Sequence, residues 1–92
     1  MIIPYTHWMY FDDRGEAEQC AAELAALDFL CGIDRSHDDT AWLLRAARET
    51  SDTIAQHNLV EEITTRHGGQ YDGGETGLMD PGTGKFIRQA ES

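Results

Sequence analysis

The sequence predicts a small α+β domain in which a four-stranded antiparallel sheet carries two helices on one face. Three observations support this class. Strand-like and helix-like segments follow one another in the order strand, helix, strand, strand, helix, strand. Each helix-like segment begins after a carboxylate side chain that can cap it, and the second ends at Gly68 and Gly69, which favour a tight reversal. A chain of 92 residues can bury only one modest core, so we expect one domain.

The first strand and the first helix are predicted in the N-terminal third of the chain. Residues 5–11 read Tyr-Thr-His-Trp-Met-Tyr-Phe, a composition that suits a pleated surface. Asp13 and Glu16 then have the spacing of a capping box, so a helix should begin here and end near Leu27. Apolar residues that recur every three or four positions predict its buried side: Ala17, Cys20, Ala21, Leu24 and Leu27.

A hairpin should follow this helix. Phe29, Cys31 and Ile33 alternate with other residues and predict the second strand. The polar run over residues 35–39 predicts a turn. Residues 40–49 then predict the third strand as the hairpin partner, although their Ala and Arg content also suits a helix.

The second helix and the fourth strand complete the pattern. Ser51 or Asp52 should cap a helix that ends near His67. Residues 70–79 predict the last strand, which glycines interrupt. The predicted buried side of the helix is broad: Ile54, Ala55, Leu59, Val60 and Ile63.

This order is the split βαβ pattern of a ferredoxin-like fold. Two right-handed crossovers place strands one and three in the centre of the sheet and both helices on one face. Residues 80–84 (Asp-Pro-Gly-Thr-Gly) predict a turn. We therefore expect a single ferredoxin-like domain over residues 1–80 and a flexible polar tail over residues 81–92.

One face of the predicted sheet has no helix to cover it. Met9 and Phe11 share the helix-facing phase of the first strand, so the side chains between them should point the other way. Trp8 and Tyr10 are then on the open face, and Trp42 or Leu43 of the third strand joins one layer or the other. Large uncovered apolar surfaces usually contact a partner. The open face therefore predicts protein docking or a homodimer, with partial cover by the N-terminal residues and the tail as the alternative.

The charge balance indicates which partners to expect. Seven Lys and Arg residues against seventeen Asp and Glu residues give a net charge of −10. Such a surface repels phosphate backbones, which disfavours direct binding of nucleic acid. It can attract a basic protein surface, including one that normally holds RNA. The alternative is that the charge only keeps the protein soluble.

The two cysteines and the chain ends suggest a cytoplasmic protein. Cys20 and Cys31 lack CxxC spacing and fall on apolar phases, which predicts buried thiols rather than a disulfide. We find neither a signal-peptide pattern nor an apolar segment long enough to span a membrane.

Four segments together resemble the domain family of the regulator of ribonuclease E activity B. They are the Trp-Met-Tyr-Phe strand at 8–11, the alanine-rich helix through 24–27, the alternating strand at 29–33 and Gly-Gly-Gln-Tyr-Asp-Gly at 68–73. The likeness extends over residues 7–79, and the Gly-Gly-x-Tyr-Asp-Gly element is its most specific part. Family members are cytoplasmic, ferredoxin-like proteins that bind the endoribonuclease and inhibit its cleavage of RNA. The resemblance implies a non-enzymatic regulator with an endoribonuclease as its protein partner.

The chain departs from the family pattern at two places. Gly74 stands where the family commonly has a tryptophan after Tyr-Asp-Gly, so that aromatic contact is either absent or supplied by Trp8 or Trp42. The long acidic extensions of the known regulator are replaced by a short mixed tail with Lys85 and Arg88. A homologous domain with a different partner is therefore an alternative.

No catalytic, cofactor-binding or metal-binding residues are predicted. The His37, Asp38 and Asp39 cluster suits a polar turn better than a metal site, because no helical His pair or cysteine framework accompanies it. The glycine-rich stretch precedes a strand rather than a helix, which excludes a phosphate-binding loop. A small-ligand or monooxygenase-like domain remains an alternative and should contain an enclosed apolar pocket. The predicted partner-binding residues are Trp8, Tyr10, Trp42, Tyr71, Asp72 and Glu75.

Overall fold

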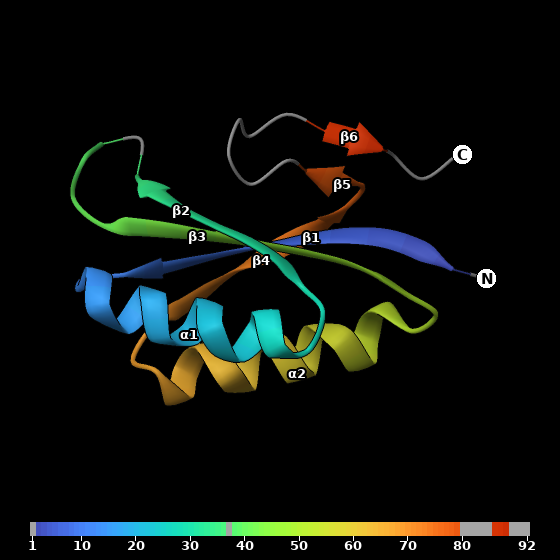
Figure 1. Ribbon diagram of the computed structural model, residues 1–92, viewed down its shortest axis with the longest axis horizontal. Helices are drawn as coiled ribbons and strands as arrows, with labels where there is room; N and C mark the ends of the chain where they lie inside the picture. The colour runs from blue at the N-terminus through green and yellow to red at the C-terminus, as the bar shows by residue number, and fades with distance from the viewer. Residues whose placement is uncertain (1, 37, 80–85, 89–92) are drawn as a thin grey trace.

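The computed structural model describes residues 2–36, 38–79 and 86–88. The predicted order of strands and helices is confirmed, with two short strands added at the C-terminal end (Figure 1). The elements are β1 (Ile3–Phe11), α1 (Arg14–Ala26), β2 (Leu30–Arg35), β3 (Trp42–Thr50), α2 (Thr53–Arg66), β4 (Gln70–Thr76), β5 (Leu78–Met79) and β6 (Phe86–Arg88).

The main sheet has four strands in the order β2-β3-β1-β4, and every neighbouring pair is antiparallel. β1 and β3 therefore occupy the centre, as predicted. Met9 pairs with Leu44 and Phe11 with Trp42 across these two strands. Figure 1 shows α1 and α2 together on one side of the sheet and the β5–β6 pair on the other. This arrangement confirms the ferredoxin-like α+β fold.

Both helices begin at aspartate caps. Asp13 Oδ2 accepts a hydrogen bond of 3.1 Å from the Glu16 amide, and Asp52 Oδ1 accepts one of 3.0 Å from the Ala55 amide. Of the two caps considered for α2, the structure uses Asp52. Each cap satisfies an amide that the first helical turn leaves without a partner.

Both helices also end in the same kind of turn. Asp28 after α1 and Gly68 after α2 have positive φ values of 71° and 82°. The next amide in each case bonds back into the helix, from Phe29 to Leu24 O at 3.1 Å and from Gly69 to Thr64 O at 2.9 Å. These are Schellman-type ends, in which a left-handed residue satisfies the last carbonyls.

The core lies between the sheet and the helices. Its buried apolar residues form one cluster: Met9, Phe11, Ala17, Cys20, Leu24, Phe29, Leu44, Ala46, Val60 and Ile63. Cys31 and Ile33 of β2 pack against this cluster, as their alternation predicted. One apolar cluster thus occupies the space between the sheet and the helices.

Three residues that were predicted to lie in the helical core are exposed. Leu27 is 38% exposed because it caps the end of α1, and Ile54 is 74% exposed on α2. Ala55 is also exposed. The inward side of α2 instead carries Gln56, Val60, Ile63 and Thr64. Gln56 can turn inward because a buried histidine provides a hydrogen-bond partner, as described below.

The C-terminal strands cover one end of the open face. The predicted strand 70–79 is divided at Gly77 into β4 and β5, and β6 lies within the predicted tail. Gly77 bonds to β1 through its amide, which donates to Pro4 O at 2.7 Å, and its carbonyl, which accepts from Thr6 Oγ1 at 2.6 Å. Thr6 and Ala47 are consequently 0% and 1% exposed. The predicted turn at residues 80–84 lies outside the described residues, and the domain boundary at residue 80 stays a prediction.

Candidate protein-docking surface

The uncovered end of the sheet carries Trp8 and Tyr10. Trp8 pairs with Arg45 and Tyr10 with Leu43 across β1 and β3, so these four side chains share the open face. Along the other edge of β1, Tyr10 pairs with Gln70 of β4. Trp8 and Tyr10 are half-buried rather than fully exposed. The structure thus places Trp8 and Tyr10, two of the six predicted contact residues, on one surface.

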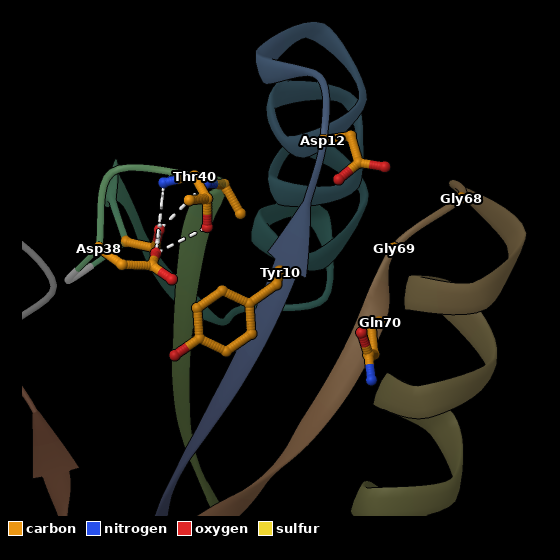
Figure 2. Close-up of a pocket in the computed structure, with 9 residues that line it drawn as sticks. Tyr10, Asp12, Asp38, Thr40, Gly68, Gly69 and Gln70 are labelled. Atoms are coloured by element: carbon orange, nitrogen blue, oxygen red, sulfur yellow. Dashed lines mark hydrogen bonds between the residues drawn. The ribbon is translucent and has the colours of Figure 1, made fainter.

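Tyr10 also lines an open cleft at the end of the sheet. The end of β1, the β2–β3 turn and the α2–β4 turn meet around this cleft, which has a volume of about 520 Å³. Figure 2 shows Asp38 and Thr40 on one side, Gly68 to Gln70 on the other, and Tyr10 and Asp12 between them. The lining residues are Tyr10, Asp12, Ser36, Asp38, Thr40, Ala41, Gly68, Gly69 and Gln70.

One wall of the cleft is a turn held together by Asp38. Its Oδ1 atom accepts hydrogen bonds from Thr40 Oγ1 at 2.7 Å, from Ser36 Oγ at 2.8 Å and from the Thr40 amide at 3.2 Å (Figure 2). The side-chain bond from Thr40, followed by that from Ser36, lowers the pKa of Asp38 to about 2. The carboxylate is therefore ionised at neutral pH.

The opposite wall contains Gly68 and Gly69, and each glycine is required for a different reason. The prediction that at least one has a positive φ is confirmed at Gly68. Gly69 has ordinary backbone geometry, but a Cβ atom there would lie 2.3 Å from the Phe11 ring. The pair therefore lets α2 end and lets the chain pass directly over the core into β4.

Trp42 and Tyr71 do not join the open face. Trp42 pairs with Phe11, and its ring is contacted by the guanidinium groups of Arg14 at 5.0 Å and Arg35 at 4.5 Å. Tyr71 directs its hydroxyl to His7 Nδ1 at 2.6 Å on the helix side. Among the predicted contact residues, these two are therefore separated from Trp8 and Tyr10 by the sheet.

Asp72 and Glu75 lie on β4 and are exposed. Thr6 of β1 pairs with Glu75, and the β1–β4 register shifts further along, between His7 and Met9. Their exposure leaves both carboxylates accessible to a partner. Whether they contact one stays a prediction.

A buried polar network lies under α2 and was not anticipated. His7 is 0% exposed, with Nε2 2.7 Å from Gln56 Oε1 and Nδ1 2.6 Å from the Tyr71 hydroxyl. Because an amide oxygen only accepts, His7 Nε2 carries the proton and Nδ1 accepts from Tyr71. Burial lowers the pKa of His7 to about 4, so the ring is neutral at pH 7. The sequence signal that could have indicated the burial of His7 is the strand phase that it shares with Met9 and Phe11.

Burial disfavours the ionised form of three side chains, those of Cys20, Cys31 and Tyr71. Burial raises the pKa of Cys20 to about 11 and that of Cys31 to about 12, and both thiols are free. Burial also raises the pKa of Tyr71. These groups stay protonated at neutral pH and are weak nucleophiles.

The described part of the chain contains neither a cluster of metal ligands nor a membrane-spanning helix. There, no three His, Cys, Asp or Glu side chains come together in a way that could hold a metal ion. His37, which belonged to the polar cluster considered from the sequence, lies outside that part. Neither α1 nor α2 is long and apolar enough to cross a membrane.

Tyr5 fills the space beside Gly74, the residue that follows the Tyr-Asp-Gly segment. A Cβ atom at Gly74 would lie 2.2 Å from Tyr5 Cε1 and 2.9 Å from the Thr6 carbonyl oxygen. Tyr5 is therefore the aromatic ring that lies beside Gly74. Trp8 lies on the open face, and the Trp42 ring is contacted by the guanidinium groups of Arg14 and Arg35.

Comparison with known proteins identifies the family. Neither the curated proteins nor the solved structures gave a match. The family model of the regulator of ribonuclease activity B matches residues 2–76, which include all four strands of the main sheet and both helices. The chain therefore belongs to the family of the regulator of ribonuclease activity B.

Proposed function

We propose that this protein is a non-enzymatic regulator that binds and inhibits an endoribonuclease of the ribonuclease E type, and so slows RNA turnover. The observation that carries the proposal is the family match over residues 2–76, nearly the whole folded part of the chain. The protonated thiols of the buried Cys20 and the half-buried Cys31 are weak nucleophiles, which supports a non-enzymatic role.

The charge of the chain supports a basic protein surface as the binding partner. A net charge of −10 opposes contact with RNA and favours association with a positively charged protein. Inhibition would then follow from occupying a surface that the ribonuclease uses for RNA or for assembly. The association should weaken as salt rises, because exposed charges are screened.

The open sheet face offers the apolar part of this contact. Trp8 and Tyr10 lie there together, and aromatic residues commonly dominate the energy of an interface. We propose these two residues as direct contacts, with Asp72 and Glu75 as exposed acidic neighbours. Trp42 and Tyr71 would act indirectly, by supporting the sheet from its helix side.

A reconstituted cleavage assay tests the proposal. Purified protein is added to the ribonuclease E-type enzyme of its native host, and cleavage of a fluorogenic RNA is followed at low and moderate salt. We expect the cleavage rate to fall as protein is added, with formation of a complex by sedimentation. An unrelated acidic protein of similar size and pI is the control for charge alone. An unchanged rate without complex formation at low salt would remove the assignment.

A further inference from the structure

The cleft at the end of the sheet combines several groups that bind cations. Its lining presents two carboxylates, from Asp12 and Asp38, together with the ring of Tyr10 and the amide of Gln70. Among the residues that the structure describes, none of those lining the cleft is Lys, Arg or His. A volume of about 520 Å³ lies within the range of sites that hold small ligands or side chains.

The negative charge of the cleft is not neutralised by neighbouring arginines. Arg14 is paired with Glu18 at 2.8 Å, and Arg35 is paired with Asp39 at 2.6 Å. Asp12 is exposed and makes no hydrogen bond or ion pair with any residue that the structure describes. The Asp12 carboxylate is therefore available to an incoming cation.

The second carboxylate is held in place. Asp38 is fixed by its bonds to Ser36 and Thr40, which leave it ionised and limit its rotation. A pre-oriented acceptor binds a cation with a smaller loss of side-chain entropy than a freely rotating one. Asp38 thus provides a rigid acceptor opposite the free carboxylate of Asp12.

The backbone of the opposite wall does not favour an anion. The Gly68 amide donates to Thr65 O at 3.0 Å and the Gly69 amide to Thr64 O at 2.9 Å. Both donors are thereby used by the end of α2. A phosphate or carboxylate ligand would find two negative side chains and no free amide from these glycines.

We propose that this cleft receives an arginine side chain from the partner protein. The inference rests on the proposed function and goes further by naming the pocket and the residue type that enters it. A guanidinium is planar, so it can donate to two carboxylates at once and stack on an aromatic ring. Asp12 and Asp38 supply the acceptors, Tyr10 supplies the ring, and the Gln70 amide oxygen supplies a neutral acceptor.

A nuclear magnetic resonance titration locates the binding site. The ¹⁵N-labelled full chain is titrated with a blocked Arg-Gly-Arg-Gly-Arg peptide and with the matched lysine peptide. We expect the amide shifts to concentrate at Thr40, Ala41 and residues 68–70, and the arginine peptide to bind more tightly. Shifts spread over all acidic surfaces, or equal affinity for both peptides, would overturn the proposal.

Charge-matched variants test the individual residues. Asp12→Asn should weaken binding of the arginine peptide by about five- to tenfold, as loss of a charge-assisted bond does. Glu62→Gln is the control, because it removes the same charge from an exposed position of α2 outside the cleft, and it should change affinity by less than about twofold. Equal effects of the two substitutions would overturn the proposal.

The aromatic contact has its own test. Tyr10→Leu should weaken binding of the arginine peptide, whereas Tyr10→Phe keeps the ring and should retain most of it. Circular dichroism of each variant establishes that the fold is kept. Should Tyr10→Leu fail to fold, Asp12→Asn still decides the outcome, because Asp12 is exposed and outside the core.

The ribonuclease complex separates this inference from the proposed function. If Asp12→Asn and Tyr10→Leu bind and inhibit the ribonuclease as well as the parent protein, the cleft proposal fails and the regulatory function stands. If the arginine peptide occupies the cleft but no ribonuclease is bound or inhibited, the regulatory function fails and the arginine site stands.

Discussion

His7 Nε2 lies 2.7 Å from Gln56 Oε1, in a site where His7 is 0% exposed and Gln56 is 2% exposed. This bond joins the central strand β1 to α2 across the core. Nδ1 of the same ring accepts a bond from Tyr71 on β4. The Gln56 Nε2 atom has no partner among the described residues. The histidine therefore links three elements of the fold.

The first prediction concerns stability at acidic pH. Burial lowers the pKa of His7 from 6.5 to about 4, so the unfolded chain takes up a proton at higher pH than the folded chain does. The stabilising contribution is present above pH 6.5 and is lost as the pH falls towards 4. Its size is on the order of 3 kcal/mol, measured as the free energy of unfolding in urea at each pH.

A double variant isolates the histidine from the carboxylates that also titrate. His7→Phe combined with Gln56→Leu removes the titrating ring and its buried polar partner together. The variant should show a smaller loss of unfolding free energy between pH 6.5 and 4 than the parent. Equal pH slopes for the two proteins would show that His7 does not control this range.

The buried network also explains where the prediction of α2 failed. Apolar periodicity assigns Ile54 and Ala55 to the core because it counts only residue types. Gln56 is inside because His7, 49 residues away in sequence, offers a hydrogen bond in the folded state. A contact of that separation leaves no local signal. The caps at Asp13 and Asp52, by contrast, depend on amides three residues away and were predictable.

The second prediction concerns the end of α1. Asp28 has φ 71°, a left-handed conformation that is unfavourable for a residue with a Cβ atom. Asp28→Gly should therefore increase the free energy of unfolding by about 0.5–1 kcal/mol. Thermal and urea denaturation measure the change. Asp34→Gly, at an exposed strand position, is the control and should destabilise the protein.

The third prediction concerns the two glycines after α2. Gly68→Val places a β-branched residue at φ 82°, and Gly69→Val places a side chain against the Phe11 ring. Each substitution should destabilise the domain by on the order of 1–3 kcal/mol, through backbone strain at the first position and overpacking at the second. Urea denaturation measures both effects.

A further variant separates the two causes. Phe11→Leu removes the ring that a side chain at position 69 would meet, so it should reduce the additional cost of Gly69→Val and leave that of Gly68→Val unchanged. Full stability of both valine variants, together with loss of partner binding, would mean that the glycines serve contact rather than backbone geometry.

The cleft illustrates what sequence patterns cannot predict. The turns near Asp38 and after Gly68 were each predictable from local composition. Their meeting beside Asp12 follows only from the strand order β2-β3-β1-β4, which brings the two turns to the same end of the sheet. The short β5–β6 pair was missed for a related reason, because two- and three-residue strands carry too little periodicity to be recognised.

The fourth prediction concerns the open face. Trp8 is half-buried on the face opposite the helices, so Trp8→Ser should leave the circular dichroism spectrum unchanged while weakening partner binding or self-association. Sedimentation velocity measures both, for the protein alone and with the ribonuclease. Ile54→Ser is the matched control, because Ile54 is an apolar side chain 74% exposed on α2, away from this face. An unchanged monomer with unchanged binding would exclude Trp8 as a contact residue. Loss of the folded state would show that Trp8 supports the sheet rather than a partner.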